Sequence, residues 1–384
     1  MYIEWLEYDN KTTGQRINHI NFRRMNLLVG KSAAGKTKIL KVISNIFRIA
    51  VDGVSLSEQV HIKLGFRVHS IRRRKDSSSK EPDERSYVWE LCTSAEQIDI
   101  EKEKPANVIE KETLYEGERS IFIRQRDRLT VMEGYKDIPR ISLDKSVIWQ
   151  FGRNEPLMMI QRNMESAVSL YEQKVALNPI LGNFLVELEK RLGNRIANSQ
   201  WSLNSLHGPI GVVIYVMHKY DTPKYDAFLD DLQTIFPEIE NIDMCPSESN
   251  EKFWQLCIVA DGKTIMQEDI SDGMLKTIYI LSVMHFCEPD SVLLYDELEN
   301  SLGPNCLDKV VDCILAHEIE AHTQFILTSH HPYIISNFPT ENWIIISQQN
   351  GVISSQRAAD IGIGNTKRDS FFEYMQYIKD GDDR

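Results

Sequence analysis

The sequence lacks long apolar runs and clustered cysteines, and each absence excludes a class of protein. No apolar run approaches the roughly 20 residues that a helix needs to cross a bilayer, and the first ten residues lack the basic and then apolar layout of a signal peptide. The six cysteines are scattered, without Cys-x-x-Cys spacing, which favours free thiols over disulfides or a zinc site. We therefore expect a cytoplasmic protein without a membrane partner.

The sequence also lacks an excess of basic residues. It has 44 Lys and Arg against 56 Asp and Glu, which gives a formal net charge of −12. Because phosphate binding needs cations that replace counterions, this balance argues against nucleic-acid binding through bulk charge. The most obvious basic run, residues 72–75, leads into a polar stretch typical of a solvated hairpin loop. A local contact with nucleic acid or a partner at this run stays open.

The periodicity of apolar residues changes along the chain. Residues 25–29 form a run typical of a buried parallel strand, and apolar residues then recur at three- and four-residue steps from Lys36, which predicts a helix. Residues 60–68 alternate as in a half-buried antiparallel strand, and helical periodicity returns over 156–236. Further strands are expected at 2–8, 17–22, 87–92, 120–124, 253–260, 292–295, 324–328 and 343–347, and further helices at 180–192, 273–286, 305–317 and 369–379. This order predicts an α/β fold with a parallel sheet flanked by helices.

A glycine-rich motif follows the first buried strand and opens the first helix. It satisfies the pattern Gly-x-x-x-x-Gly-Lys-[Ser/Thr] with Gly30-Lys31-Ser32-Ala33-Ala34-Gly35-Lys36-Thr37. In such a turn, backbone N–H groups and the helix N-terminus surround phosphates, while Lys36 reaches the β- and γ-phosphates and Thr37 holds Mg²⁺. The alternative is a strand-to-helix turn without a ligand. The position of the motif between strand and helix favours ATP binding.

Two adjacent carboxylates, Asp296 and Glu297, end the apolar strand 292–295. Acidic residues often end a strand or cap the next helix, so this pattern alone is a weak signal. Beside a phosphate loop, however, Asp296 becomes the expected metal-site carboxylate and Glu297 the expected base that orients or deprotonates the attacking water.

With these motifs the chain resembles the ABC ATPase superfamily, and within it the bacterial heads of the OLD, RecF and SMC-like groups. Residues 296–304 are similar to that group's Asp-Glu-Pro-Glu-Asn-Gly-Leu-His-Pro stretch, with Ser301 in place of glycine and Gly303 in place of histidine. Residues 325–332 are similar to its switch-histidine segment, which gives His330 a role at the γ-phosphate. The resemblance implies a P-loop NTPase fold, an ABC ATPase head with an antiparallel β subdomain and a helical lobe.

The resemblance also implies how the chain is organised. We expect a single head over residues 1–384. Its expected parts are a phosphate-loop lobe (1–58), an antiparallel β insertion (59–145), a helical lobe (146–250), a segment with the signature, Walker B strand and switch histidine (251–347) and a C-terminal tail (348–384).

Residues 270–276 resemble the ABC signature in its Ser-Asp-Gly form. An ordinary helix N-cap would have the same sequence, and a capped helix tip is itself an anion site. The resemblance implies that Ser271 and Gly273 contact the γ-phosphate held by a second copy of the chain. It therefore implies a homodimer or higher homo-oligomer in which two copies sandwich the nucleotides head to tail.

Some positions depart from the group or are assigned with less support. Residues 32–34 read Ser-Ala-Ala where the group usually has Asn-Gly-Ser, which removes a flexible glycine and a polar contact. A Q-loop glutamine is expected where the β insertion meets the helical lobe, and Gln150 is our choice, with Gln161 second. Tyr8 is a candidate to stack on adenine, or else an ordinary core or surface tyrosine.

The resemblance extends to a hypothesis about biological role. Too little chain follows His330 for the nuclease domain of OLD-type proteins, and no coiled-coil arm is present. We therefore expect an ATPase switch that controls a separately encoded effector, a nuclease or toxin, as in the Septu, PARIS and retron-associated anti-phage systems. The alternative is a RecF-like DNA-repair or recombination ATPase that binds DNA through a basic groove. The β insertion and the Ser-Asp-Gly signature disfavour a transporter ATPase.

Overall fold

The computed structural model describes residues 1–70, 83–95, 107–132, 141–169, 180–187, 210–363 and 367–380. The basic run 72–75 lies outside the described residues. Contacts divide the chain into two compact units. The first unit comprises Met1–Tyr171, Asp290–Glu297 and Thr323–Arg384, and the second comprises Glu172–Pro289 and Leu298–His322.

The first unit is built on one sheet, which has 13 strands among the described residues. Its parallel strands lie in the order β16-β3-β15-β14-β9. Strands β3, β14 and β15 are short and mostly apolar, and all their residues are buried. Parallel strands covered on both faces have this composition. The bounds are β3 (Met25–Val29), β9 (Val168–Ser169), β14 (Val292–Tyr295), β15 (Gln324–Thr328) and β16 (Trp343–Gln349).

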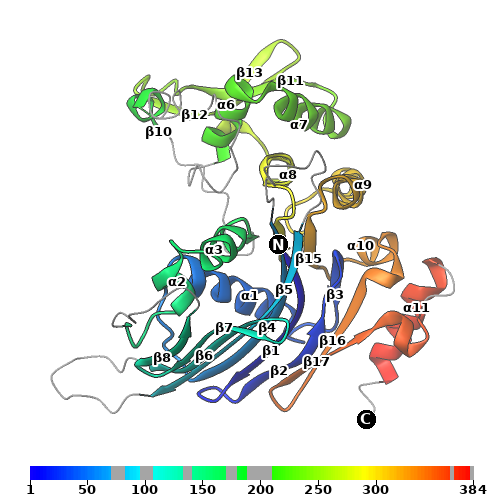
Figure 1. Cartoon of the computed structure of the whole chain (residues 1–384). Coiled ribbons are helices and arrows are strands. Elements are labelled where there is room, and N and C mark those ends of the chain that lie inside the picture. The colour runs from blue at the N-terminus through cyan, green and yellow to red at the C-terminus, as the bar shows by residue number, and fades with distance from the viewer. Residues whose placement is uncertain are drawn as a thin grey trace. The chain divides into compact units, whose positions relative to one another are not determined.

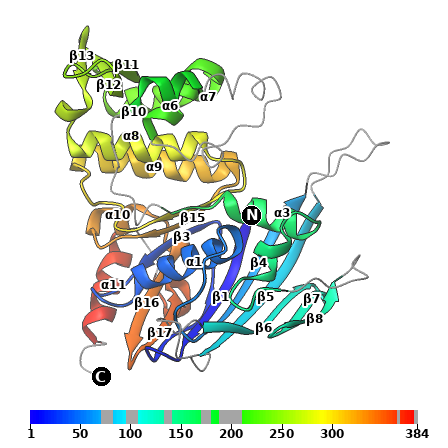
Figure 2. The same cartoon turned by 90° about the vertical axis from the view of Figure 1, so that its left-hand side faces the viewer.

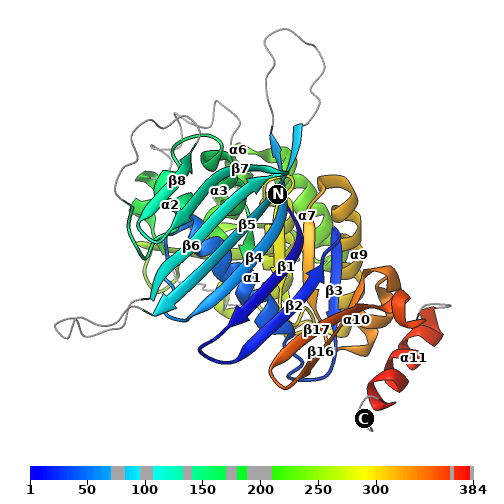
Figure 3. The ribbon, with the colours of Figure 1, turned by 60° about the horizontal axis from the view of Figure 1, so that its bottom comes forward.

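The antiparallel part continues the same sheet, in the order β8-β7-β6-β5-β4-β1-β2, with β17 joining β2 to β16 (Figure 3). Alternating side chains give these strands one face toward the core and one toward solvent. The expected β insertion is therefore an extension of the central sheet. The bounds are β1 (Tyr2–Asn10), β2 (Gln15–Asn21), β4 (Val60–Ser70), β5 (Asp83–Ala95), β6 (Asn107–Glu116), β7 (Arg119–Gln125), β8 (Arg128–Met132) and β17 (Val352–Arg357).

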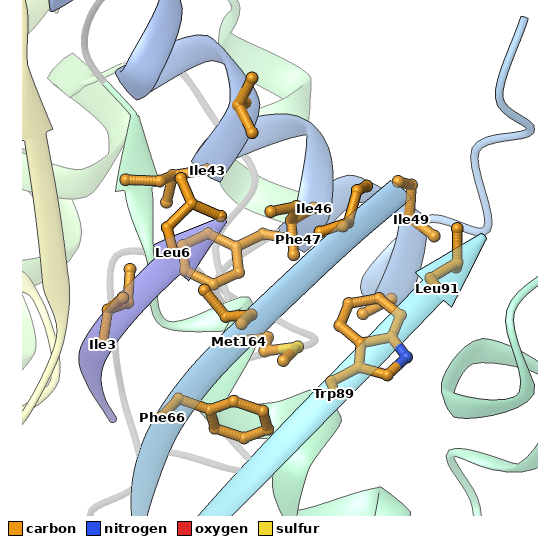
Figure 4. Packing of buried hydrophobic residues seen from close by; sticks show 14 of the residues in the cluster. Ile3, Leu6, Ile43, Ile46, Phe47, Ile49, Phe66, Trp89, Leu91 and Met164 are labelled. Atoms are coloured by element: carbon orange, nitrogen blue, oxygen red, sulfur yellow. The ribbon is translucent and has the colours of Figure 1, made fainter. Parts of the chain in front are cut away.

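Helix α1 (Lys36–Val51) covers one face of this sheet (Figures 1 and 2). Its apolar stripe packs against side chains of β1, β4 and β5 and against Met164 of α3, and Figure 4 shows Ile43, Ile46, Phe47, Ile49, Ile3, Leu6, Phe66, Trp89 and Leu91 in this core. Each such buried side chain contributes roughly 1.5–3 kcal/mol. Helices α2 (Val147–Phe151) and α3 (Leu157–Glu165) pack on α1 in the first unit, although they begin the segment expected as a helical lobe.

The C-terminal part of the first unit adds short helices after β15 and a final helix. The bounds are α10 (Pro332–Asn337), η2 (Thr340–Asn342), η3 (Ala358–Ile361) and α11 (Lys367–Asp380). Tyr374 of α11 is buried against Trp343, at 6.0 Å between ring centroids. The expected amphipathic tail helix is thus present, and it packs on this unit.

The second unit combines a small antiparallel sheet with helices. Its strands are β10 (Ile180–Leu181), β11 (Ile239–Pro246), β12 (Phe253–Ala260) and β13 (Lys263–Met266), and its helices are α6 (Ile210–Tyr220), α7 (Thr222–Ile235), η1 (Gln267–Asp269), α8 (Asp272–Phe286) and α9 (Pro304–Ala321). The helix expected over 180–192 is wrong at its start, because Ile180 and Leu181 pair with β12. Among the described residues, no helix is long and apolar enough to cross a membrane.

Candidate nucleotide-binding site

The phosphate loop, residues 30–37, joins β3 to α1 in the first unit. Its two glycines lie where a side chain would collide. A Cβ on Gly30 would lie 2.3 Å from the Ile346 carbonyl oxygen of β16, and a Cβ on Gly35 would lie 2.4 Å from Cδ1 of Ile353. Gly35 also has a φ of +95°, in the left-handed region that favours glycine. The motif's glycines thus let the loop turn closely against β16 and β17.

Lys36 is folded into this loop. Its side chain is buried, and Nζ donates hydrogen bonds to the carbonyl oxygens of Gly30 and Lys31, both at 2.9 Å. Ser32 and Ala33 are exposed at the tip, whereas Ala34 packs into the hydrophobic core. The departure from Asn-Gly-Ser thus leaves a closed turn with a positive charge at its centre, an arrangement that can compensate phosphate oxygens.

The loop meets the two carboxylates across the sheet. Strand β15 pairs in parallel with β3 and with β14, so the carboxyl ends of all three strands lie at one edge. There the Thr37 hydroxyl donates a hydrogen bond to Oδ1 of Asp296 at 3.1 Å, although the two residues are 259 positions apart. A hydroxyl and a carboxylate oxygen are ligands that suit Mg²⁺. Thr37 and Asp296 could therefore hold this metal.

Thr328, for which the sequence motifs predicted no role, completes this cluster. Its hydroxyl donates to Oδ1 of Asp296 at 2.6 Å and accepts from the backbone N–H of Glu297 at 2.8 Å. Glu297 itself is exposed and has a φ of +48°, which is uncommon for a residue other than glycine. The available sequence signal was a hydroxyl directly after the apolar run 325–327.

His330 lies two residues after the end of β15, at the same edge of the sheet, and it is exposed. The next residue, His331, donates its backbone N–H to the Ser329 hydroxyl at 3.0 Å and precedes the first residue of α10. The structure thus brings His330, Asp296, Glu297 and the phosphate loop to one edge of the first unit.

The two glutamines considered for the Q-loop are engaged elsewhere in the first unit. Gln150 lies on α2, where its side chain accepts from the Ser142 N–H at 2.7 Å and donates to the Lys145 carbonyl at 2.8 Å. Gln161 donates to the carbonyl of Ala50, near the end of α1, at 3.1 Å. Neither contact reaches the phosphate loop. The chain beyond β9, the strand beside β14, lies outside the described residues at 170–179.

Tyr8 is a core residue. It is 7% exposed, and its hydroxyl accepts a hydrogen bond from Nδ2 of Asn10 at 3.0 Å. Burial raises the pKa of this hydroxyl. Of the two roles considered for Tyr8, the structure therefore agrees with the core role.

Ser271 and Gly273 belong to the second unit, at the start of α8. The Ser271 hydroxyl accepts the backbone N–H of Met274 at 3.3 Å, which caps the helix. A Cβ on Gly273 would lie 2.9 Å from the Ser301 carbonyl, so the helix tip and the 301 turn pack closely. Ser301 has a φ of +65°, so the serine keeps a conformation that glycine adopts freely.

Comparison with known proteins gives one family match. Residues 248–336 match the family described as "AAA domain, putative AbiEii toxin, Type IV TA system". No curated protein matches the chain. Two similar solved structures are an SMC head bound to the C-winged helix domain of ScpA, with a TM-score of 0.48, 13% identity and coverage of 93% of this chain and 97% of that one, and an SMC head domain from Thermotoga maritima, with a TM-score of 0.41, 13% identity and coverage of 93% and 99%.

The matched segment contains Ser271, Gly273, Asp296, Glu297, Thr328 and His330. The α/β P-loop fold expected from the sequence is confirmed, and over residues 248–336 the chain is similar to AAA-type ATPase domains.

Proposed function

We propose that the chain is an ATPase that binds ATP with Mg²⁺ and hydrolyses the bond between its β- and γ-phosphates. The observation that carries the proposal is the cluster of Thr37, Asp296, Glu297 and Thr328 beside the buried Lys36. Together these residues supply a cation, two hydroxyls and two carboxylates at one edge of a parallel sheet, and phosphoryl transfer uses groups of these kinds.

Each residue has a role that its position supports. Lys36 and the N-terminus of the 16-residue helix α1 offset the charge of the β- and γ-phosphates. Thr37 and Asp296 hold Mg²⁺, which when bound neutralises charge that develops on the phosphate oxygens. Glu297 orients or deprotonates the attacking water, and His330 contacts the γ-phosphate. Gln150 stays outside this proposal because its amide holds the turn 142–145.

We further propose that the chain works as a homodimer. The helix tip with Ser271 and Gly273 offers a capped N-terminus, and such a tip suits an anion. In the proposed dimer each copy supplies this tip to the γ-phosphate that the other copy holds. ATP then joins two copies, and hydrolysis separates them.

The biological proposal is a switch that controls a separate effector, a nuclease or toxin, in anti-phage defence. The description of the matched family names a toxin of a toxin–antitoxin system, which supports a role in a multi-component system. Copurification with the products of neighbouring genes would support the proposal. A chain that cuts nucleic acid without a partner would contradict it.

The DNA-binding alternative has less support from the antiparallel half of the sheet. There Arg67, Lys111 and Arg85 form ion pairs with Glu4, Glu90 and Glu116. Cations already paired with carboxylates gain less from replacing the counterions of a phosphate backbone. Salt-dependent DNA binding strengthened by ATP would restore this alternative.

The replacement Glu297→Gln tests the enzymatic proposal. Loss of the carboxylate removes the base while Lys36 and Thr37 still bind nucleotide. We therefore expect ATP turnover to fall roughly 10²- to 10⁴-fold, with dimers that accumulate in ATP and are visible by light scattering. Glu118→Gln, at an exposed turn after β6, is the matched control. Unchanged turnover in Glu297→Gln would exclude Glu297 as the base.

A further inference from the structure

Thr328 is the last residue of β15, and the residue is 1% exposed. A threonine hydroxyl has one proton to donate and lone pairs that accept. Here the proton goes to Oδ1 of Asp296 at 2.6 Å, and the oxygen accepts the N–H of Glu297 at 2.8 Å. One buried hydroxyl therefore contacts both members of the carboxylate pair.

The strand register explains this double contact. Strands β14 and β15 are parallel, and their last register pair is Tyr295 with Leu327. The residues one step further along are Asp296, directly after β14, and Thr328, the last residue of β15, so they lie side by side. Buried apolar residues on both strands set this register. The packing of the core therefore places the Thr328 hydroxyl next to Asp296 and Glu297.

The two hydrogen bonds of Thr328 restrict Asp296 and Glu297, the residues whose positions the proposed ATP hydrolysis depends on. A short hydrogen bond to an ionised carboxylate is among the stronger ones in proteins, so it fixes the orientation of Asp296. The other bond holds the peptide that leads into Glu297, whose φ of +48° lies in the left-handed region. Such conformations persist where surrounding contacts enforce them, and they concentrate at functional sites.

We propose that Thr328 is a positioning residue that sets the geometry of both the metal-site carboxylate Asp296 and the base Glu297. The inference rests on the proposed ATPase function. Thr328 does not touch the nucleotide in this proposal. Its loss should therefore lower kcat and leave the KM for ATP unchanged, because the phosphate loop that binds the nucleotide keeps its own contacts.

Steady-state ATP hydrolysis by Thr328→Val and Thr328→Ser tests the inference. Valine keeps the shape of threonine without its hydroxyl, and we expect kcat to fall about 10- to 100-fold, the size of effect that misplaced catalytic groups produce. Serine keeps the hydroxyl and should restore kcat to within about threefold of wild type. Thr328→Ala, which also lacks the hydroxyl, provides the same comparison if the valine variant does not fold.

Thr323→Val is the matched control. Thr323 lies directly before the same strand and is fully buried, but its hydroxyl has no hydrogen-bond partner in the part of the chain that the structure describes. This variant should keep kcat. Wild-type kcat in Thr328→Val, or equal losses in Thr328→Val and Thr323→Val, would overturn the inference while leaving the ATPase proposal intact. A wild-type chain that hydrolyses no ATP would defeat the ATPase proposal and the inference together.

Discussion

At the scale of single residues, Arg124 and Glu112 form a fully buried ion pair in the first unit. The Arg124 side chain is fully buried, and its guanidinium donates to the carbonyls of Arg126 at 2.7 Å, Lys145 at 2.6 Å and Ser142 at 2.7 Å. Glu112, also fully buried, lies 3.6 Å away and accepts from the Ser146 hydroxyl at 2.6 Å. Burial lowers the pKa of Arg124 and raises that of Glu112. The pair thus ties the 142–146 turn to the sheet.

Replacement of Arg124 by lysine should destabilise this unit. A lysine amine cannot reproduce the planar fork that satisfies three carbonyls, so part-buried carbonyl oxygens next to the buried Glu112 lose partners. We expect a loss of about 3 kcal/mol or more in the free energy of unfolding, measured by urea denaturation. Arg128→Lys, at an exposed position four residues later, should change it little. Equal stability of the two variants would show that the fork is dispensable.

Single residues also show which parts of the site the sequence could reveal. The glycine-rich loop could be recognised because its motif consists of neighbouring residues, and Gly30 and Gly35 each meet a local steric requirement of the turn. The Thr328 contacts were not visible, since they depend on the register between β14 and β15. Glu112 and Arg124 were missed for the same reason: they face each other as a register pair of β6 and β7.

At the scale of elements, burial on both faces made some strands easy to predict. The bounds expected for β3, β12, β14 and β15 agree with the structure, because turn residues flank each apolar or alternating run. The two-residue strands β9 and β10 were not predicted. A strand that short has no period of its own, and the neighbouring strand to which it pairs defines it.

Helices α7, α8 and α9 of the second unit enclose a titratable cluster. His285 of α8 contacts Oδ2 of Asp231 of α7 at 2.8 Å, and its ring lies 5.9 Å from that of His317 on α9. Burial, and secondarily the charge of His285, lowers the pKa of His317 from 6.5 to about 4, against a smaller opposing effect of Asp231. The folded state therefore keeps His317 neutral where an unfolded chain would protonate it.

This shift predicts a pH dependence of stability. Between pH 6.5 and about 4 the unfolded state binds more protons at His317 than the folded state does, so stability falls as the pH is lowered through that range, by up to about 3 kcal/mol. Thermal unfolding between pH 7.5 and 4.5 should show a smaller decline for His317→Gln than for wild type. His331→Gln, at an exposed position, is the control and should follow wild type. Parallel curves for His317→Gln and wild type would remove His317 as the cause.

At the scale of the whole molecule, the α/β class could be predicted and the order of strands could not. Strand β17 joins β2 to β16, and β9 lies beside β14. The β17–β2 and β9–β14 pairs join segments far apart in the chain, so no local pattern reports them. Alternation indicated β4, and strands were also expected near β1, β2, β5 and β7, whereas β6 and β8 were not predicted. Only the structure shows that all of these strands extend the parallel sheet.

The proposed head-to-tail dimer predicts that each ATP site takes Lys36 from one copy and Ser271 from the other. Lys36→Ala should abolish binding in the loop that carries it, and Ser271→Ala should impair the tip offered to the other copy. Each variant alone should therefore be inactive. A mixed dimer has one site with both residues intact and one site with neither. Because random pairing of two variants in a twofold dimer makes about half of the dimers mixed, an equal mixture should recover about one quarter of wild-type turnover.

This recovery separates action between copies from action within one copy. If Ser271 served the nucleotide of its own chain, no mixed dimer would contain an intact site, and the mixture would stay as inactive as its components. In the control mixture, Lys41→Ala, at an exposed position on α1, replaces Lys36→Ala. Copies with Lys41→Ala keep both Lys36 and Ser271, so we expect this mixture to show more than one quarter of wild-type turnover. The test requires that subunits exchange, so the variants are mixed before ATP is added, since ATP holds the proposed dimer together.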